Sequence, residues 1–134
     1  MSATNATELK ASVDALAALA HEGRLGIFRT LVQRGPAGLK PGELAAACSM
    51  PDSTLSFHLA HLLRAGLVSR RRAGRTLIYA AHFDTMNALI GYLTENCCAG
   101  SATACAPTGC APASARAAAT TLRVRRLHRP RRTA

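Results

Sequence analysis

Apolar side chains near the start of the chain fall three or four positions apart, a period that predicts an amphipathic helix. Asn5 followed by Glu8 has the spacing of a capping box and predicts where this helix begins. Its apolar positions are Leu9, Val13, Leu16 and Leu19. A second helix is expected over about residues 22–33 and should end at Gly35-Pro36. Its inward-facing residues are predicted to be Leu25, Phe28, Leu31 and Val32.

Two more helices are predicted after a turn rich in glycine and proline. The first is short and covers about residues 43–48, which are mostly alanine. Met50-Pro51-Asp52 then leads into a longer helix that ends near Arg64, where Ala65-Gly66 supplies a C-terminal cap. The buried stripe of the longer helix is predicted to be Leu55, Leu59, Leu62 and Leu63.

The remaining pattern changes from helical spacing to short β-prone runs and then back. Residues 67–70 and 75–80 predict two strands of a hairpin with Ala73-Gly74 at its tip. A last helix is expected over about residues 83–96, with Met86, Ile90 and Leu93 on one stripe. Three helices, a turn, a helix, a hairpin and a final helix are the element order of a winged helix-turn-helix. The predicted fold class is therefore mostly α with a β-hairpin.

A helix-turn-helix places its second helix in the major groove of DNA, and small hydroxyl side chains permit close approach to bases and phosphates. For His58, both a DNA contact and packing at the helix-turn-helix joint with a hydrogen bond to the backbone stay open. For Phe57, contact with thymine methyl groups and coverage of the neighbouring helix both stay open. The candidate DNA-binding residues are Ser53, Thr54, Ser56, Phe57, His58 and His61 in the helix, and Arg71, Arg72 and Arg75 in the hairpin.

The net charge of +10 favours a polyanionic partner, but it is unevenly distributed. Residues 116–134 contain seven arginines and no acidic residue, whereas the chain before them is only mildly basic. Residues 99–121 are dominated by small and polar residues, which predicts a tail without a packed core. We therefore expect a folded domain over residues 1–98 and a flexible tail over 99–134. With no long apolar run and no secretion signal, a cytoplasmic location is expected.

Five cysteines in such a chain are expected to be thiols or metal ligands rather than a disulfide framework. Cys48 is interpreted as a small buried residue. The others lie together after the last predicted helix, without the Cys-x-x-Cys pairs that zinc prefers. Adjacent thiols with one more nearby favour a three-coordinate thiolate site for As(III) or Sb(III), with Pb(II) or Cd(II) as alternatives. The cluster is Cys97, Cys98, Cys105 and Cys110.

The third ligand of this site is a close choice. Closing the loop from Cys98 to Cys105 costs less chain entropy than closing it to Cys110, by only ~0.5 kcal/mol. Cys105 is therefore preferred, and Cys110 remains the alternative. Adjacent thiols also form disulfides, so an oxidation sensor stays open as well.

One enzymatic alternative rests on the spacing of Cys110 and Arg116, the Cys-x5-Arg pattern of thiol phosphatases and some arsenate reductases. Such a loop must follow a buried strand so that its backbone N–H groups converge on an oxyanion. No strand is predicted before Cys110. The protein is therefore not expected to be an enzyme.

The chain resembles the ArsR/SmtB family of metal-responsive repressors, and within it the arsenic-responsive branch with a C-terminal Cys-Cys site. The resemblance covers about ninety residues and rests on five segments: 15–25 (ALAALAHEGRL), 53–59 (STLSFHL), 64–68 (RAGLV), 74–75 (GR) and 94–98 (TENCC). The family's other arsenic site, a Cys-x-Cys before the helix-turn-helix, is replaced here by Lys40-Pro41-Gly42. Its zinc site needs an interior histidine in the last helix, and this chain has none there.

The resemblance implies a homodimer that pairs through its first and last helices and represses a resistance operon until the ion binds. It places Ser53, Thr54, Ser56 and His58 in the recognition helix and Arg71, Arg72 and Arg75 in the wing. It assigns the inducer site to Cys97, Cys98 and Cys105. The implied partners are operator DNA, a second copy of the chain and As(III) or Sb(III) as inducer, with no resident cofactor and no membrane.

Overall fold

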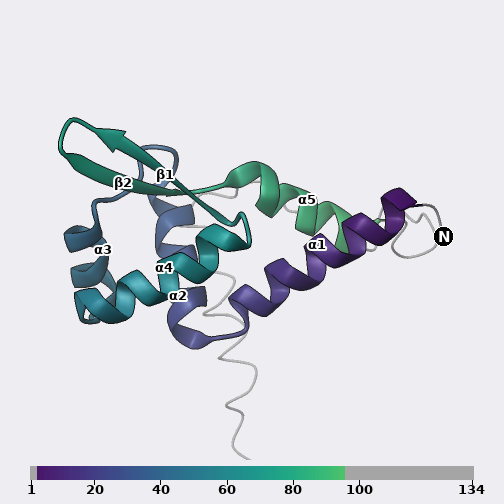
Figure 1. Cartoon of the computed structure of the whole chain (residues 1–134), viewed down its shortest axis with the longest axis horizontal. Coiled ribbons are helices and arrows are strands. Elements are labelled where there is room, and N and C mark those ends of the chain that lie inside the picture. The colour runs from purple at the N-terminus through teal and green to yellow at the C-terminus, as the bar shows by residue number, and fades with distance from the viewer. Residues whose placement is uncertain (1–2, 96–134) are drawn as a thin grey trace, which may run out of the picture. The chain divides into compact units, whose positions relative to one another are not determined.

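The computed structural model of the chain describes residues 3–95, with side chains from residue 5 onward. The elements of this part follow the order expected for a winged helix-turn-helix (Figure 1). The predicted boundary after residue 98, the four clustered cysteines and the arginine-rich segment all lie outside the described residues. The elements are α1 (Ala3–Leu19), α2 (Glu22–Arg34), α3 (Pro41–Cys48), α4 (Asp52–Arg64), β1 (Val68–Ala73), β2 (Thr76–Ala81) and α5 (Phe83–Thr94).

The start of α1 differs from the sequence prediction, whereas α2 begins where it was predicted but with a cap that the sequence did not indicate. α1 already begins at Ala3, so the capping box predicted at Asn5 is wrong, because Asn5 lies inside the helix. α2 begins after His21, whose extended backbone and ring nitrogen provide the cap. The Nδ1 atom of His21 accepts a hydrogen bond from the backbone N–H of Gly23 at 3.0 Å. Histidine is not among the usual N-cap residues, so the sequence pattern did not indicate this role.

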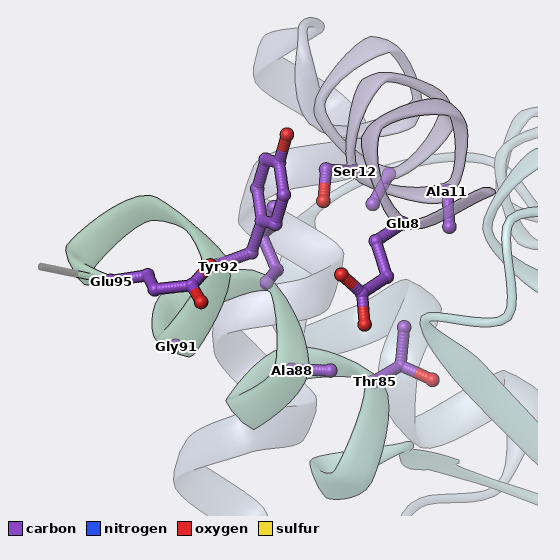
Figure 2. Close-up of a pocket in the computed structure, with 10 residues that line it drawn as sticks. Glu8, Ala11, Ser12, Thr85, Ala88, Gly91, Tyr92 and Glu95 are labelled. Atoms are coloured by element: carbon purple, nitrogen blue, oxygen red, sulfur yellow. The ribbon is translucent and has the colours of Figure 1, made fainter. Parts of the chain in front are cut away.

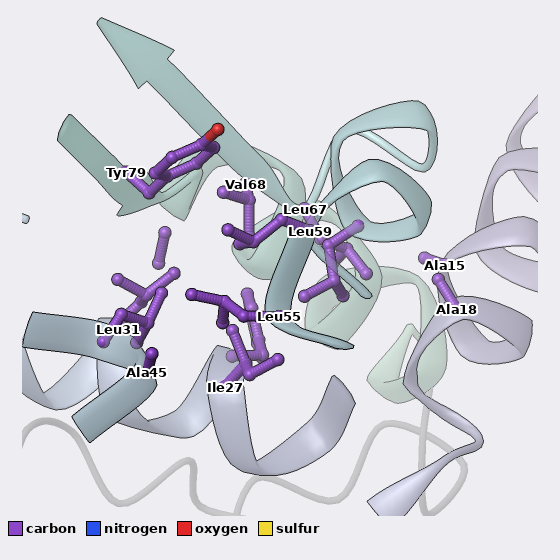
Figure 3. Packing of buried hydrophobic residues seen from close by; sticks show 14 of the residues in the cluster. Ala15, Ala18, Ile27, Leu31, Ala45, Leu55, Leu59, Leu67, Val68 and Tyr79 are labelled. Atoms are coloured by element: carbon purple, nitrogen blue, oxygen red, sulfur yellow. The ribbon is translucent and has the colours of Figure 1, made fainter. Parts of the chain in front are cut away.

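The hydrophobic core lies between α2, α3, α4 and the hairpin. Figure 3 shows Ile27 and Leu31 of α2 facing Leu55 of α4, with Val68 and Tyr79 of the hairpin above them. The stripe predicted for α4 is confirmed, with its fourth member, Leu63, only partly buried. The side chains that are almost completely buried are Ile27, Leu31, Leu44, Leu55, Leu62 and Leu67.

Several apolar residues predicted on helical stripes do not face this core. Leu25 was expected to point inward but is 43% exposed, and Ile27 is buried in its place. α1 buries Ser12, Ala15 and Ala18 instead of its larger apolar residues. The fully buried positions of α1 carry small side chains and α5 fully buries only Leu89, so several large apolar groups of the two helices face outward. These exposed residues are Leu9, Val13 and Leu16 of α1 and Ile90 and Leu93 of α5.

The hairpin pairs Val68 with Ala81 at its base and Ala73 with Thr76 at its end. Its tip is therefore Gly74-Arg75, one residue later than predicted, with Gly74 at a φ of +63°. A glycine with positive φ at the first position of a two-residue loop is typical of a II′ turn. The α2–α3 loop joins β2 through a bridge between Leu39 and Tyr79, which ties the wing to the helical core. None of the helices in residues 3–95 has the length and hydropathy needed to cross a bilayer.

Candidate nucleic-acid interface

The helix-turn-helix consists of α3, a tight turn and α4. Ser49 adopts a left-handed backbone with a φ of +51°, and the N–H of Met50 donates to the carbonyl of Ala45 at 3.1 Å. Pro51 precedes α4, and its carbonyl accepts from Leu55 N–H at 3.0 Å. Because the leucine stripe anchors one side of α4 in the core, the opposite side is left at the surface.

The surface side of α4 contains most of the predicted DNA-binding residues. The hydroxyl residues Ser53, Thr54 and Ser56 are exposed, and so is Phe57. His61 is half-buried on the same helix, and the edge of its ring contacts Phe57 with the ring centroids 4.8 Å apart. The structure therefore brings these five side chains to one helix, where they can reach a major groove.

His58 is the exception, and its predicted DNA contact is wrong for this structure. The side chain is only 6% exposed because it follows the leucine stripe into the core rather than the surface of α4. Its ring packs against the ring of His21 with the centroids 4.7 Å apart. His58 is therefore packed between helices, which confirms the second role in part, but it lies against the start of α2, and its buried Nδ1 atom makes no backbone hydrogen bond within residues 3–95.

The surroundings of His58 disfavour its charged form. Burial lowers the pKa of His58 below its ordinary value of 6.5, and the neighbouring His21, Arg24 and His61 lower it further. Its buried Nδ1 atom has no hydrogen-bond partner within the described part of the chain. A neutral His58 thus fills space beneath the recognition helix in the way that an apolar residue would.

Desolvation also lowers the pKa of His61, and the positive charges of Arg64 and Arg24 add to the effect. The Nδ1 atom of His61 lies 3.3 Å from Nη2 of Arg64. At neutral pH the imidazole is therefore uncharged, so one of its nitrogens can donate and the other can accept a hydrogen bond. The sequence analysis did not include Arg64 among the DNA-binding candidates, because this residue was used to mark the end of the helix. Its spacing of three residues from His61 places both side chains on one helix face and could have indicated it.

The wing carries four exposed arginines along β1 and at the hairpin tip. Alternation along the strand places Arg70 and Arg72 on one face and Arg71 on the other. The Nη2 atom of Arg71 donates to the carbonyl of Ala37 at 3.0 Å, which steadies the wing against the α2–α3 loop. Arg75 lies at the tip. The single ion pair within residues 3–95 joins Lys10 and Asp14, so no carboxylate neutralises the wing.

A second exposed surface lies between α1 and α5. It contains a cavity of about 500 Å³ between the two helices, and the exposed apolar residues described above belong to the same helices but do not line this cavity. Figure 2 shows Glu8 of α1 and Tyr92 of α5 projecting into this space, with Ser12 and Thr85 nearby. We call the exposed side chains Leu9, Val13, Leu16, Ile90 and Leu93 the α1/α5 apolar face.

The predicted inducer site cannot be placed, because Cys97, Cys98, Cys105 and Cys110 lie outside the described residues. Cys48 is half-buried against the core, and its sulfur lies 3.8 Å from the hydroxyl oxygen of Thr30. The prediction of a small buried residue is therefore confirmed in part, because Cys48 packs on the core but is only half-buried. Within residues 3–95 no cluster of three histidine, cysteine or acidic side chains is suited to hold a metal ion.

The chain is similar to known transcriptional regulators in both sequence and structure. Residues 19–71 match a family described as a helix-turn-helix domain. The transcriptional activator HlyU of Vibrio cholerae is 36% identical over 83 residues, which cover 62% of this chain and 74% of HlyU.

Two solved structures extend the comparison. One is the homodimeric winged helix-turn-helix DNA-binding domain of Mb0332 from Mycobacterium bovis, a possible ArsR-family transcriptional regulator. It is 28% identical with a TM-score of 0.57, over 72% of this chain and 89% of that one. The other is a possible transcriptional regulator for arsenical resistance, 28% identical with a TM-score of 0.52, over 60% of this chain and 80% of that one. The protein is a winged helix-turn-helix transcriptional regulator rather than an enzyme, and it belongs to the ArsR/SmtB family.

Proposed function

We propose that the protein is a homodimeric repressor that binds an operator through two copies of α4 and the wing and is released by As(III) or Sb(III). The observation that carries the proposal is the exposed face of α4. Its hydroxyl side chains and neutral His61 lie on the helix that follows a helix-turn-helix turn. The unneutralised arginines of the wing supply the contacts to flanking phosphates.

The α1/α5 apolar face supports self-association. Five large apolar side chains, each more than 40% exposed, are gathered on two neighbouring helices. Exposed apolar side chains gathered on neighbouring elements are typical of interaction sites in soluble proteins. The similar domain of Mb0332 is homodimeric. A twofold dimer would present two α4 helices to half-sites about 34 Å apart, one turn of DNA, on a pseudo-palindromic operator.

The choice of inducer rests on the cysteines that follow α5 in the sequence. Cys97 and Cys98 follow the last described residue, Glu95, after one intervening residue in the sequence, and Cys105 or Cys110 would complete a three-thiolate site. α5 carries part of the α1/α5 apolar face, so an ion bound next to it is well placed to alter the dimer. The ion can act only through unequal affinity for the two forms of the dimer, a coupling of about 1–3 kcal/mol.

The test is fluorescence anisotropy of a labelled fragment of the gene's own upstream DNA. Full-length protein is held just above saturation in excess reductant, and arsenite is titrated in. Wild type and the matched control Cys48→Ala should both be released, because Cys48 packs on the core and lies outside the predicted site. Cys97→Ser/Cys98→Ser should bind the DNA as tightly as wild type and should stay bound when arsenite is added.

Two other results would change the assignment. Specific binding that resists arsenite but is relieved by Cd(II) or Pb(II) would identify another soft ion as the inducer. Release by a mild oxidant, reversed by reductant and absent in the Cys97→Ser/Cys98→Ser variant, would identify a thiol-oxidation sensor. Equal affinity for the upstream fragment and a scrambled duplex would contradict the repressor proposal altogether.

A further inference from the structure

Phe57 stands out on the surface of α4 because it is large, apolar and 62% exposed. Most of the other accessible residues of α4 are hydroxyl-bearing or basic, namely Ser53, Thr54, Ser56, His61 and Arg64, and the remaining exposed ones are Asp52 and the small Ala60. We propose that Phe57 reads the C5-methyl group of a pyrimidine in the major groove. This inference rests on the proposed function, since it requires α4 to enter that groove.

Two ring contacts hold the phenyl group in place. The ring of His61 meets it in an edge-to-face arrangement, with the centroids 4.8 Å apart and the planes at 72°. The ring of the buried His58 is also near it, with the centroids 5.8 Å apart and the planes at 60°. Because aromatic pairs of this geometry are favourable, the phenyl group is already positioned before DNA arrives. Little side-chain entropy is then lost when it binds.

The chemistry of the groove selects the target. Each base edge in the major groove displays hydrogen-bond donors or acceptors, and the C5-methyl of thymine is its principal apolar feature. A phenyl group makes no hydrogen bond to the polar atoms and would only remove water from them. The base feature that it complements is therefore a methyl group at C5. Thymine carries this group, and cytosine carries it after methylation.

The location of Phe57 argues against a role in the core or in self-association. The other exposed large apolar residues of the described chain lie on α1, α2 and α5, whereas Phe57 is the one on α4. In Figure 1 α5 and the N-terminal part of α1 lie on the right of the view, and α4 runs from beside α3 on the left toward the centre. Phe57 thus belongs to a different helix from the α1/α5 apolar face.

The experiment removes methyl groups from the DNA and the ring from the protein. Full-length protein in excess reductant first selects its preferred duplex from randomised DNA. This duplex is then made in three forms: unmodified, with deoxyuridine in place of every thymidine, and with 5-methylcytosine in place of every cytosine. Dissociation constants are measured by anisotropy at one salt concentration for wild type, Phe57→Ala, Phe57→Leu and the control Ser53→Ala.

For wild type, we expect deoxyuridine to weaken binding about fourfold for each methyl group contacted, the value for burying one methyl-sized group. Phe57→Ala should bind the two forms almost equally, and Phe57→Leu should keep part of the difference. Ser53→Ala should weaken binding but preserve the wild-type ratio. If deoxyuridine has no effect and 5-methylcytosine tightens binding of wild type but not of Phe57→Ala, the methyl group read is that of methylated cytosine.

The same ratio in wild type and Phe57→Ala, or no response to any C5-methyl group, would overturn the inference while leaving the repressor proposal intact. Failure to enrich any sequence would overturn both. Because Phe57 is exposed, Phe57→Ala should fold normally, which circular dichroism will show. The comparison of duplex forms with wild type alone tests methyl recognition even if that variant misfolds.

Discussion

The ring of His21 packs on the ring of His58 with their centroids 4.7 Å apart, so the residue that caps α2 also covers the buried histidine of the recognition helix. The Nε2 atom of His58 also lies close to Gly23, where a β-carbon would come within 3.1 Å of it. The first turn of α2 and the middle of α4 are therefore fitted to one another. Ionisation of His58 would place a charge inside this contact.

The stability of the protein should fall as the pH drops below 6.5. The pKa of His58 is lower in the folded protein than in the unfolded chain. Below pH 6.5 the unfolded chain therefore binds a proton at His58 more readily than the folded protein does. The contribution of neutral His58 is complete above pH 6.5 and declines below it, by at most ~1.4 kcal/mol per pH unit. Urea unfolding between pH 8 and pH 5 measures the trend. His58→Leu should show a shallower decline, and parallel curves for the two proteins would contradict the prediction.

Gly38 should not tolerate a side chain. Its φ is +68°, and a β-carbon there would collide with the backbone carbonyl of Tyr79 in the bridge between the α2–α3 loop and β2. We expect Gly38→Ala to lower the free energy of unfolding by at least ~2 kcal/mol. Gly42→Ala is the control, because a β-carbon in α3 meets nothing and should stabilise by up to ~1 kcal/mol. Chemical denaturation measures the free energy of unfolding of Gly38→Ala and Gly42→Ala. Equal values for the two variants would contradict the prediction.

Charge placed on the α1/α5 apolar face should break the dimer. Leu16 of α1 and Leu25 of α2 are the same residue type and are both 43% exposed, which makes them a matched pair. Leu16→Glu should shift the protein toward monomer and weaken operator binding at least tenfold, because a buried unpaired carboxylate is costly. Leu25→Glu should remain dimeric. Sedimentation velocity distinguishes them, and a dimeric Leu16→Glu protein would place the interface elsewhere.

Arg75 at the wing tip should contribute to affinity without contributing to sequence preference. Removing one phosphate contact per subunit should reduce the slope of log K against log salt by about two for a dimer. Arg75→Ala should weaken binding to specific and scrambled duplexes by similar factors. Arg29→Ala, which removes an exposed arginine of α2, should leave the slope unchanged. Anisotropy at several salt concentrations measures this, and an unaltered slope for Arg75→Ala would exclude a phosphate contact.

Local sequence signals determined the order and type of the elements. Helical periodicity predicted α2, α4 and α5 close to their observed limits, since each has an apolar stripe and a clear start or stop such as Pro51 or Gly35, whereas α3, predicted from residue 43, begins at Pro41. The β-prone runs around Gly74 predicted the hairpin with a one-residue error at the tip. These features depend on residues that are close in sequence, so they could be read without knowing the tertiary structure.

The tertiary structure decided which side of each helix is buried. Leu16 and Leu25 fit helical stripes as well as Ile27 does, but only Ile27 is enclosed, because burial depends on which helix faces which. In the same way His58 belongs to the core and Phe57 to the surface, although they are neighbours in a helix predicted to touch DNA. Periodicity counts apolar positions but does not say whether the core or a second molecule covers them, and that depends on contacts between segments far apart in sequence.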